Sequence, residues 1–374
     1  MEKSKGGQAP GQTAAEAALL ACLRDDGRRK VAVLFGGCSP EYAVSLASAH
    51  AVLTHLDAAR YQAVPVGITR EGEWYFYGGD PEAIPADRWH TAGNCIPAVV
   101  SQGRKLHGLI VFGSGGPSGV PLDAAFPVLH GQNGEDGTVQ GLLELAGIPV
   151  AGCGALSSAL CMDKDMAHRV VAAAGVAVPR ARVLDGRATG TEALRQAEAV
   201  GYPLFVKPVR AGSSYGVTRV ETPAALPEAV RRALAFDRRA VLEQAIEGFE
   251  VGCAVLGDGE LLAGAVDEIE LAQGFFDYTE KYTLETAKIH VPARIPPEKA
   301  REVQEAAVRI YRALGCAGFA RVDLFLQPDG ALVFNEVNTI PGMTAHSRYP
   351  AMMREIGVPL QGIVRRVLEG AVEG

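Results

Sequence analysis

The sequence predicts a multidomain protein of mixed α/β and α+β class, in which an N-terminal parallel α/β domain precedes a two-lobed region. The chain has 374 residues, more than one hydrophobic core usually serves. Apolar strands, glycine loops and helices alternate in its first part, which is typical of a parallel sheet. Strands in the second part lack this regular spacing, which indicates an α+β arrangement.

The predicted domain boundaries follow changes in this pattern. Residues 1–29 are rich in Gly, Gln and Ala and only weakly helical, so we expect a flexible leader. Residues 30–153 are expected to form the N-terminal α/β domain, residues 154–239 the central lobe, and residues 240–374 the C-terminal lobe.

The N-terminal domain opens with a buried strand, Lys30 to Phe35, followed by Gly36-Gly37. Ser39 suits an N-cap and Pro40 the first helical position, so a helix should run to about Leu56. Further expected elements are strands at 61–68, 72–76, 109–112 and 125–129 and a helix at 141–146.

Later elements are expected from the same signals. A helix from Asp163 should end before Gly175, and a second should run from Pro297 to Leu314. Strands are expected at 204–208, from 217, and at 241–242, 250–256 and 261–266, and a hairpin should close the series at 322–337.

Composition excludes several classes of protein. The chain is 48% hydrophobic and 21% charged, with a net charge of −7 and no basic block, so nucleic acid is not an expected partner. No apolar run approaches the roughly 18 residues of a membrane span, and no secretory signal is evident. The seven cysteines lack C-x-x-C and disulfide-like spacing, which favours free thiols in a cytoplasmic protein and gives no support for zinc.

The hairpin at 322–337 carries the strongest chemical signal. Side chains alternate along a strand, so Arg321 and Asp323 share one face, as do Glu336 and Asn338. With Pro328-Asp329 at the centre of the turn, Arg321 lies opposite Glu336 and Asp323 lies diagonally within reach. Oxygen ligands of this kind suit Mg²⁺, and a cation beside an arginine suggests phosphoryl or acyl-phosphate chemistry.

A solvated sheet edge is the ordinary explanation for polar residues on one strand face. Here the polar residues interrupt rows of Val, Leu and Phe, where burial without a partner is costly. A register slip of one residue would turn one set away from the other.

A Gly/Ser loop follows Lys207 and ends near Val217. Its small residues allow backbone N–H groups to surround phosphate oxygens, and the hydroxyls of Ser213 and Ser214 add donors. It is not a Walker loop, because no Gly-Lys-Ser/Thr precedes a helix. A flexible hairpin explains the loop equally well.

Other polar positions are weaker signals taken singly. Lys164 opens a helix, where the helix dipole disfavours a cation unless an anion is present. Glu243 to Glu250 follows an apolar strand, where spaced carboxylates suit an adenine amino group and a ribose, although solvated acids fit as well. Glu41 and His130 follow strand ends, where α/β sheets bind ligands. The aromatic-rich segment 273–283 is expected to be a lid or a loop packed on the core.

Together these segments resemble the D-alanine–D-alanine ligase family of ATP-grasp enzymes, including its D-alanine–D-serine relatives. The resemblance extends from about Lys30 to the end of the chain and rests on the order of its motifs. These are GGCSPE, HGQNGEDGTVQG, MDK, VKPVRAGSSYGV, DYTEKY, RVD and NEVNTIPGMTAHS.

The resemblance implies a two-lobed ATP-grasp fold and ATP-dependent joining of D-alanine to a second D-amino acid through an acyl phosphate, for peptidoglycan precursors. The implied catalytic and substrate-binding residues are Glu41, His130, Ser213, Tyr282, Arg321, Gly342 and Ser347. The implied ATP-binding residues are Lys164, Lys207, Ser214, Glu243, Ala245, Ile246, Glu250 and Lys281. The implied ligands for two Mg²⁺ ions, which Mn²⁺ can replace, are Asp323, Glu336 and Asn338. A cytoplasmic homodimer is implied as well.

The second substrate stays open between D-alanine and D-serine. Ser347-Arg348-Tyr349-Pro350 and Cys38 to Glu41 look like the vancomycin-resistance D-alanine–D-serine branch, whereas Lys281-Tyr282 argues against the D-lactate branch. Another ATP-grasp carboxylate ligase and a non-catalytic nucleotide-binding module are the remaining alternatives.

Overall fold

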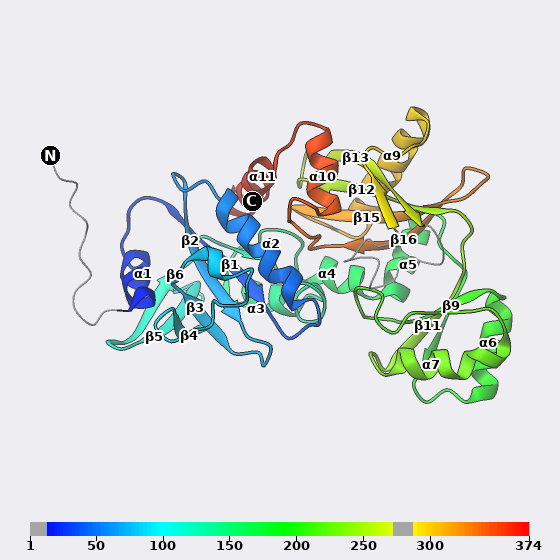
Figure 1. Cartoon of the computed structure of the whole chain (residues 1–374), viewed down its shortest axis with the longest axis horizontal. Coiled ribbons are helices and arrows are strands. Elements are labelled where there is room, and N and C mark those ends of the chain that lie inside the picture. The colour runs from blue at the N-terminus through cyan, green and yellow to red at the C-terminus, as the bar shows by residue number, and fades with distance from the viewer. Residues whose placement is uncertain (1–12, 272–286, 374) are drawn as a thin grey trace.

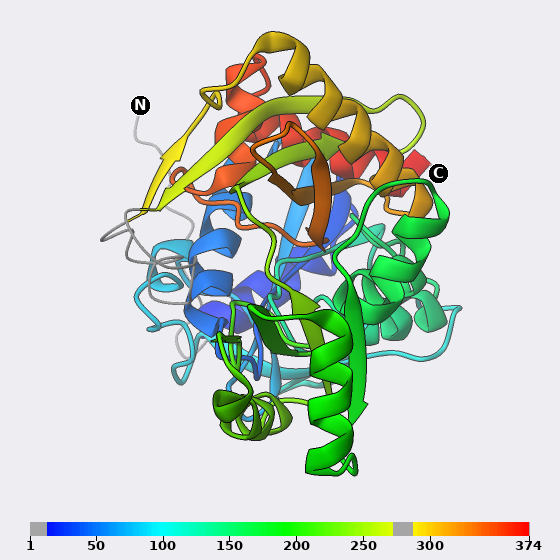
Figure 2. The ribbon, with the colours of Figure 1, turned by 90° about the vertical axis from the view of Figure 1, so that its right-hand side faces the viewer.

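The computed structural model describes residues 13–271 and 287–373. Three sheets organise the molecule, of seven, four and five strands. In Figure 1 the seven-stranded sheet lies at the left, the five-stranded sheet at the upper right, and the four-stranded sheet at the lower right. Figure 2 shows the green central lobe beneath the C-terminal lobe, whose strands run from yellow-green to orange.

The seven-stranded N-terminal sheet has the strand order β6-β5-β4-β3-β2-β1-β7. Its strands are β1 (Arg29–Gly36), β2 (Tyr61–Ile68), β3 (Trp74–Tyr77), β4 (Cys95–Val100), β5 (Gly108–Gly113), β6 (Gly116–Pro121) and β7 (Ala124–Pro127). Pairing is parallel between β1 and its neighbours β2 and β7, and antiparallel from β2 through β6.

The expectation of a parallel N-terminal domain is therefore correct for three strands and wrong for the other four. The turn from Thr69 to Glu73, closed by Thr69 N–H donating to Glu73 O at 2.9 Å, is too short for a parallel crossover. The sequence analysis also missed β4 and β6, and β6 contains glycine and proline that obscure a strand pattern.

Residues of the predicted leader form the first helix. Helix α1 (Ala14–Cys22) begins with a capping box between Thr13 and Glu16 and buries Ala15 and Leu19 against the sheet. A side chain at Gly78 would come within 2.6 Å of Ala15 Cα, so this glycine lets the helix approach closely. The described part of the leader, from Thr13 on, is thus packed on the domain.

Helix α2 (Tyr42–His55) covers β1 but begins later than expected, with Glu41 rather than Ser39 at its N-cap. Ser39 instead uses its hydroxyl twice, accepting from Glu41 N–H at 3.0 Å and donating to His130 O at 2.7 Å. The hydroxyl therefore fixes Glu41 next to the loop that carries His130. Helix α3 (Thr138–Ala146) ends at Gly147, which has a left-handed φ of 75°.

The central lobe is the four-stranded sheet with its helices. Its strand order is β10-β9-β11-β8, from β8 (Ala181–Asp185), β9 (Leu204–Pro208), β10 (Thr218–Val220) and β11 (Arg239–Gln244). Helices α4 (Ala155–Met162) and α5 (Lys164–Ala173) lead into this lobe, which contains α6 (Gly190–Val200) and α7 (Leu226–Leu234). The short 3₁₀ helix η2 (Pro223–Ala225) directly precedes α7, and η1 (Pro81–Ala83) lies in the N-terminal domain.

The C-terminal lobe is a five-stranded sheet between helices. Its order is β14-β13-β12-β15-β16, from β12 (Phe249–Leu256), β13 (Leu262–Leu271), β14 (Ala287–His290), β15 (Phe319–Leu326) and β16 (Leu332–Asn338). Helix α9 (Pro297–Ala313) packs with Val251 and Val255, whereas α10 (Arg348–Glu355) packs with Ala254 on the opposite face. Helix α11 (Leu360–Glu373) then returns to pack on α2 (Figure 1).

The register of the hairpin β15–β16 differs from the expected one. Arg321 lies opposite Asn338 and Asp323 opposite Glu336, with a register shift between Asp323 and Leu324. Leu326 pairs with Leu332, so the turn has five residues, and the bulge adds one more residue on β16. All four polar residues still meet on neighbouring strands. No helix among residues 13–271 and 287–373 is long and apolar enough to cross a membrane.

Candidate active site

Two neighbouring cavities lie between the parts of the molecule: the first where the N-terminal domain meets both lobes, and the second between the two lobes. The first has a volume of about 460 Å³ and the second about 630 Å³. Lys164, Ala211 and Glu336 line both of them. A ligand in one cavity is therefore in reach of a ligand in the other.

The first cavity collects the predicted substrate-binding and catalytic residues. Those lining it are Glu41, His130, Ser213, Arg321, Asn338, Gly342 and Ser347. The second cavity collects the predicted nucleotide-binding residues Lys207, Ser214, Glu243, Ala245, Ile246 and Glu250. Asp323 lines neither cavity, and the predicted Lys281, Tyr282 and lid segment lie outside the described residues.

Glu41 is held where the N-terminal domain meets the Gly/Ser loop of the central lobe. Its carboxylate accepts a hydrogen bond from the Ser213 hydroxyl. Side chains at Gly131 or Gly212 would come within 2.2 and 3.1 Å of its Oε2 atom, so both glycines make room for it. Ser213 and Ser214 have φ values of 48° and 58°, a strained conformation that is common at ligand sites.

His130 is a buried neutral base in the wall of the first cavity. Loss of hydration, together with the Arg321 charge, lowers its pKa to about 4 from the ordinary 6.5. Its Nε2 atom lies 3.4 Å from Ser48 Oγ. The ring is therefore uncharged at neutral pH and does not compete with Arg321 for carboxylates.

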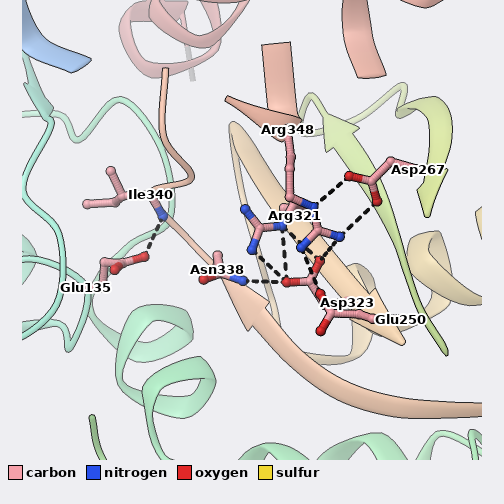
Figure 3. Close-up of polar contacts among 8 residues, drawn as sticks. All are labelled: Glu135, Glu250, Asp267, Arg321, Asp323, Asn338, Ile340 and Arg348. Carbon is pink, nitrogen blue, oxygen red and sulfur yellow. Dashed lines mark hydrogen bonds and ion pairs between the residues drawn. The ribbon is translucent and has the colours of Figure 1, made fainter. Parts of the chain in front are cut away.

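A buried charge cluster lies behind the first cavity (Figure 3). Arg321 donates from Nε and Nη2 to Asp323 at 2.8 and 2.7 Å, and Asn338 Nδ2 donates to the same carboxylate at 2.9 Å. Arg348 donates to Asp267 at 2.6 and 2.8 Å and to Glu250 at 2.8 Å, and its Nη2 lies 3.3 Å from Asp323 Oδ1.

This cluster fits because of a glycine on the neighbouring strand. A side chain at Gly252 would come within 2.5 Å of Arg348 Nη2 and 2.6 Å of Asp267 Oδ1. Asp267 is fully buried and Arg348 nearly so, so each charge depends on the other for its stability. Arg348 thereby joins Glu250 of the second cavity to Asp323 beside the first.

The second cavity is fixed by a buried ion pair. Lys207 Nζ lies 2.5 Å from Glu243 Oε1, and the two residues are diagonal neighbours on β9 and β11. His168 approaches the same carboxylate at 3.9 Å, and burial lowers the pKa of its imidazole. A buried cation and carboxylate on one wall suit a ligand with both an anionic group and a hydrogen-bond donor.

Lys164 links the two cavities. It follows the N-cap Asp163, whose side chain accepts from Met166 N–H at 3.2 Å, so the helix N-terminus already has a capping anion. Its Nζ atom donates to Ala211 O at 2.8 Å. The ammonium group is thus directed across the helix end towards the Gly/Ser loop.

The predicted metal ligands differ in their surroundings. Glu336 lines both cavities and Asn338 lines the first, and both side chains offer oxygen ligands of the type that Mg²⁺ prefers. Asp323 is already bonded to two arginines and an amide. Across residues 13–271 and 287–373, no three His, Cys, Asp or Glu side chains converge as metal ligands. The donor set fits Mg²⁺ that takes most of its ligands from water and phosphate.

Two features in and around the first cavity were not predicted from the sequence. Asp267 pairs with Arg348 across 81 residues of sequence, and no local pattern signals such a pair. Glu135 lines the first cavity, where loss of hydration and the charges of Glu41 and Glu336 raise its pKa to about 8. Its place in HGQNGEDG, directly after a strand end, was the one available signal.

Comparisons with known proteins identify the family of the chain. Residues 30–153 match the family profile described as D-ala D-ala ligase N-terminus, and residues 170–369 match the one described as D-ala D-ala ligase C-terminus.

Individual relatives align over nearly the whole chain. A Streptomyces coelicolor protein, provisionally named as a D-alanine–D-lactate ligase, is 47% identical over 93% of this chain and 99% of its own length. A Thermoanaerobacter D-alanine–D-alanine ligase is 42% identical over 92% of this chain and 97% of its own. The crystal structure of the VanG D-Ala:D-Ser ligase from Enterococcus faecalis superposes with a TM-score of 0.86 at 52% identity, covering 92% of this chain and 100% of that one.

Proposed function

Since this chain belongs to the D-alanine–D-alanine ligase family of ATP-dependent ligases, which act on D-amino acids, we propose that it joins D-alanine to a second D-amino acid through a D-alanyl phosphate. The observation that carries this proposal is that the two cavities share Lys164 and Glu336. A nucleotide in the second cavity can then present its phosphate tail to a carboxylate in the first.

ATP supplies the activation that the reaction needs, because a carboxylate is a poor electrophile at neutral pH. The carboxylate of the first D-alanine attacks the terminal phosphoryl group, and ADP leaves. The neutral amine of the second amino acid then attacks the acyl carbon, phosphate leaves, and the amine nitrogen gives up one proton as the amide forms. Such reactions depend mostly on positioning and on electrostatic stabilisation of spread charge.

The residues of the first cavity take the amino-acid roles. Glu41 binds the ammonium group of the first D-alanine, helped by neutral His130. Arg321 and the backbone N–H of Gly342 stabilise the oxyanion, as preorganised donors do in acyl transfer. Ser347 holds the carboxylate of the second amino acid; its hydroxyl already lies 2.8 Å from Thr344 Oγ1 at the start of α10.

The residues around the second cavity take the nucleotide roles. Lys164, Lys207 and Lys281 contact the phosphates, with Ser214 in the same loop. Glu243, Ala245 and Ile246 surround the adenine, and Glu250 contacts the ribose. Ser213 and Tyr282 link the lid segment to Glu41.

Mg²⁺ would be held by Asp323, Glu336 and Asn338, and when bound it would neutralise phosphate charge. In the structure Asp323 is held by Arg321, Arg348 and Asn338. These partners keep the buried carboxylate from standing as an unpaired charge.

The second amino acid is proposed to be D-alanine, with D-serine as the second candidate. The 52% identity to the VanG D-Ala:D-Ser ligase favours keeping D-serine. A D-serine hydroxyl needs a hydrogen-bond partner in the cavity, since burying it without one costs affinity.

Phosphate release and product mass decide among the acceptors. We expect ATP-dependent phosphate release with D-alanine alone. D-serine or D-lactate is then added to D-alanine, and the mass of the product identifies the preferred acceptor. L-alanine is the matched control and should give no release. An absence of turnover with every D-substrate would remove the ligase assignment.

A homodimer and a cytoplasmic location are proposed on family resemblance. Light scattering of the purified chain tests the dimer. A monomeric mass at the concentration of the activity assay would argue against it.

A further inference from the structure

Glu135 connects two segments that are far apart in sequence and that both line the first cavity. Its Oε2 atom accepts from Gly131 N–H at 2.9 Å, within the loop that carries His130. Its Oε1 atom accepts from Ile340 N–H at 3.1 Å, which follows β16 in the C-terminal lobe (Figure 3). One carboxyl group therefore holds the N-terminal domain against the segment that contains Gly342.

The Ile340 segment has a second tie to the N-terminal domain. Met343 N–H donates to Ser48 Oγ at 3.2 Å, and Ser48 lies on α2. The two ties fall on either side of Gly342 in the sequence. They fix the backbone whose N–H group must point at the reacting carbonyl, and oxyanion donors act only when aimed to within a few tenths of an ångström.

Loop geometry makes Glu135 a rigid support. Glu135 N–H and Gly134 N–H both donate to Gly131 O, at 2.8 and 3.1 Å. A side chain at Gly134 would come within 2.5 Å of Leu129 O, so the loop closes tightly on the end of β7. Gln140 Nε2 donates to Gly134 O at 2.7 Å and ties the loop to α3.

The position requires a carboxyl group rather than an amide. Both carboxyl oxygens retain acceptor lone pairs in either protonation state, whereas an amide nitrogen has none. Glutamine could satisfy only one of the two backbone N–H groups and would face the other with a donor. A carboxyl group here is buried and lies near Glu41 and Glu336, which raises its pKa, and the two N–H donors offset this only in part.

We propose that Glu135 is a positioning residue for acyl transfer: by holding the Ile340 and Gly131 backbones together, it aims the Gly342 N–H at the oxyanion formed when the second amino acid attacks. This inference rests on the proposed ligase function. It assigns Glu135 no contact with the substrate. Its loss should impair capture of the acyl phosphate more than formation of the acyl phosphate.

Glu135→Gln and Glu135→Asp test this, with Glu144→Gln as the matched control. Glu144 also accepts a backbone N–H from another element, that of Ala155 at 2.8 Å, but lines neither cavity. We expect kcat/KM for the second amino acid to fall about 10²-fold in Glu135→Gln, as a displacement of about 1 Å can cause. The ratio of phosphate to dipeptide should rise above one-to-one, while KM for ATP stays unchanged.

Hydrogen exchange provides a readout that does not depend on activity. The Ile340 amide should exchange faster in Glu135→Gln than in wild type, and Glu144→Gln should leave it unchanged. Faster exchange together with an unchanged phosphate-to-dipeptide ratio would overturn the positioning role. A second outcome would also overturn it. In that outcome Glu135→Gln lowers thermal stability, and Glu135→Asp restores the stability but not the phosphate-to-dipeptide ratio. If wild type releases no phosphate with D-amino acids, the proposed function fails instead.

Discussion

The two cavities are built in different ways. The second cavity takes its key pair, Lys207 and Glu243, from diagonal neighbours on two paired strands. The first cavity depends on hydrogen bonds between separate parts of the chain, such as Ser213 to Glu41 and Ile340 to Glu135. Strand pairing therefore sets the Lys207–Glu243 pair of the second cavity in advance, whereas the first cavity forms only when the N-terminal domain and both lobes come together.

This difference has a consequence for function. A site held by strand pairing keeps its geometry while other parts of the molecule shift. A site held by ties between domains changes with every displacement of those domains, so it can respond to what binds in the neighbouring cavity. Arg348 bonds to Glu250, which lines the second cavity, and to Asp323, which lies beside the first.

Arg348→Ala gives the largest expected effect and tests whether the buried cluster joins the two sides. Removing the guanidinium leaves the fully buried Asp267 without its cation, and breaking a buried pair typically costs about 3–5 kcal/mol. Urea unfolding should show this loss in the free energy of unfolding. Arg354→Ala, an exposed arginine on the same helix, is the control and should change stability by under about 0.5 kcal/mol. Equal stability of the two variants would mean that the cluster contributes no net ion pairing.

The contrast between the cavities also explains which features could be predicted from sequence. Strand β2 was placed at its observed bounds, because an apolar run between turn residues defines a buried strand. The predicted residues of the second cavity were named from a family resemblance whose motifs each lie within one short stretch of chain. The pairing of Arg348 with Asp267 and the bond from Glu135 to Ile340 span 81 and 205 residues, and no local periodicity encodes such contacts.

Two errors have the same physical origin. The register of β15–β16 was set from a symmetric turn, but a five-residue turn and a bulge displaced it. The leader was expected to be flexible because α1 has few strongly apolar residues, yet Ala15, Leu19 and Cys22 are buried where Gly78 allows close approach. In both cases a partner elsewhere in the fold decided the outcome.

His130→Gln tests the inter-domain side through its dependence on pH. The pKa of His130 is lowered to about 4 from 6.5, so the unfolded chain binds more protons between these values. The contribution of His130 to the free energy of unfolding of the wild type should therefore be fully present above pH 6.5. It should fall as the pH drops towards 4, by about 3 kcal/mol for a pKa shift of this size. The variant lacks the histidine and therefore this pH dependence. The difference in free energy of unfolding between wild type and variant should shrink as the pH falls from 6.5 to 4.

A matched control for this measurement is His55→Gln, at the exposed end of α2. This variant keeps His130, so it should lose stability towards pH 4 as the wild type does. If the stability difference between wild type and His130→Gln does not change over this pH range, His130 is not kept neutral by its surroundings, and the first cavity is more open to water than the burial of His130 indicates.

Arg321→Ala sharpens the comparison at the chemical step. Removing an oxyanion donor lowers kcat by about 10²-fold or more, which corresponds to roughly 2.7 kcal/mol. Arg321 lines the first cavity, so KM for ATP should change little, because the second cavity keeps its own Lys207–Glu243 pair. Steady-state kinetics with ATP and D-alanine varied separately resolves the two effects.

Arg309→Ala, which replaces an exposed arginine on α9, controls for the loss of a positive charge. Near-normal turnover of Arg321→Ala would dismiss its oxyanion role. A large rise in KM for ATP would mean that the two cavities are not built independently, because Arg321 would then support the nucleotide through Asp323 and Arg348.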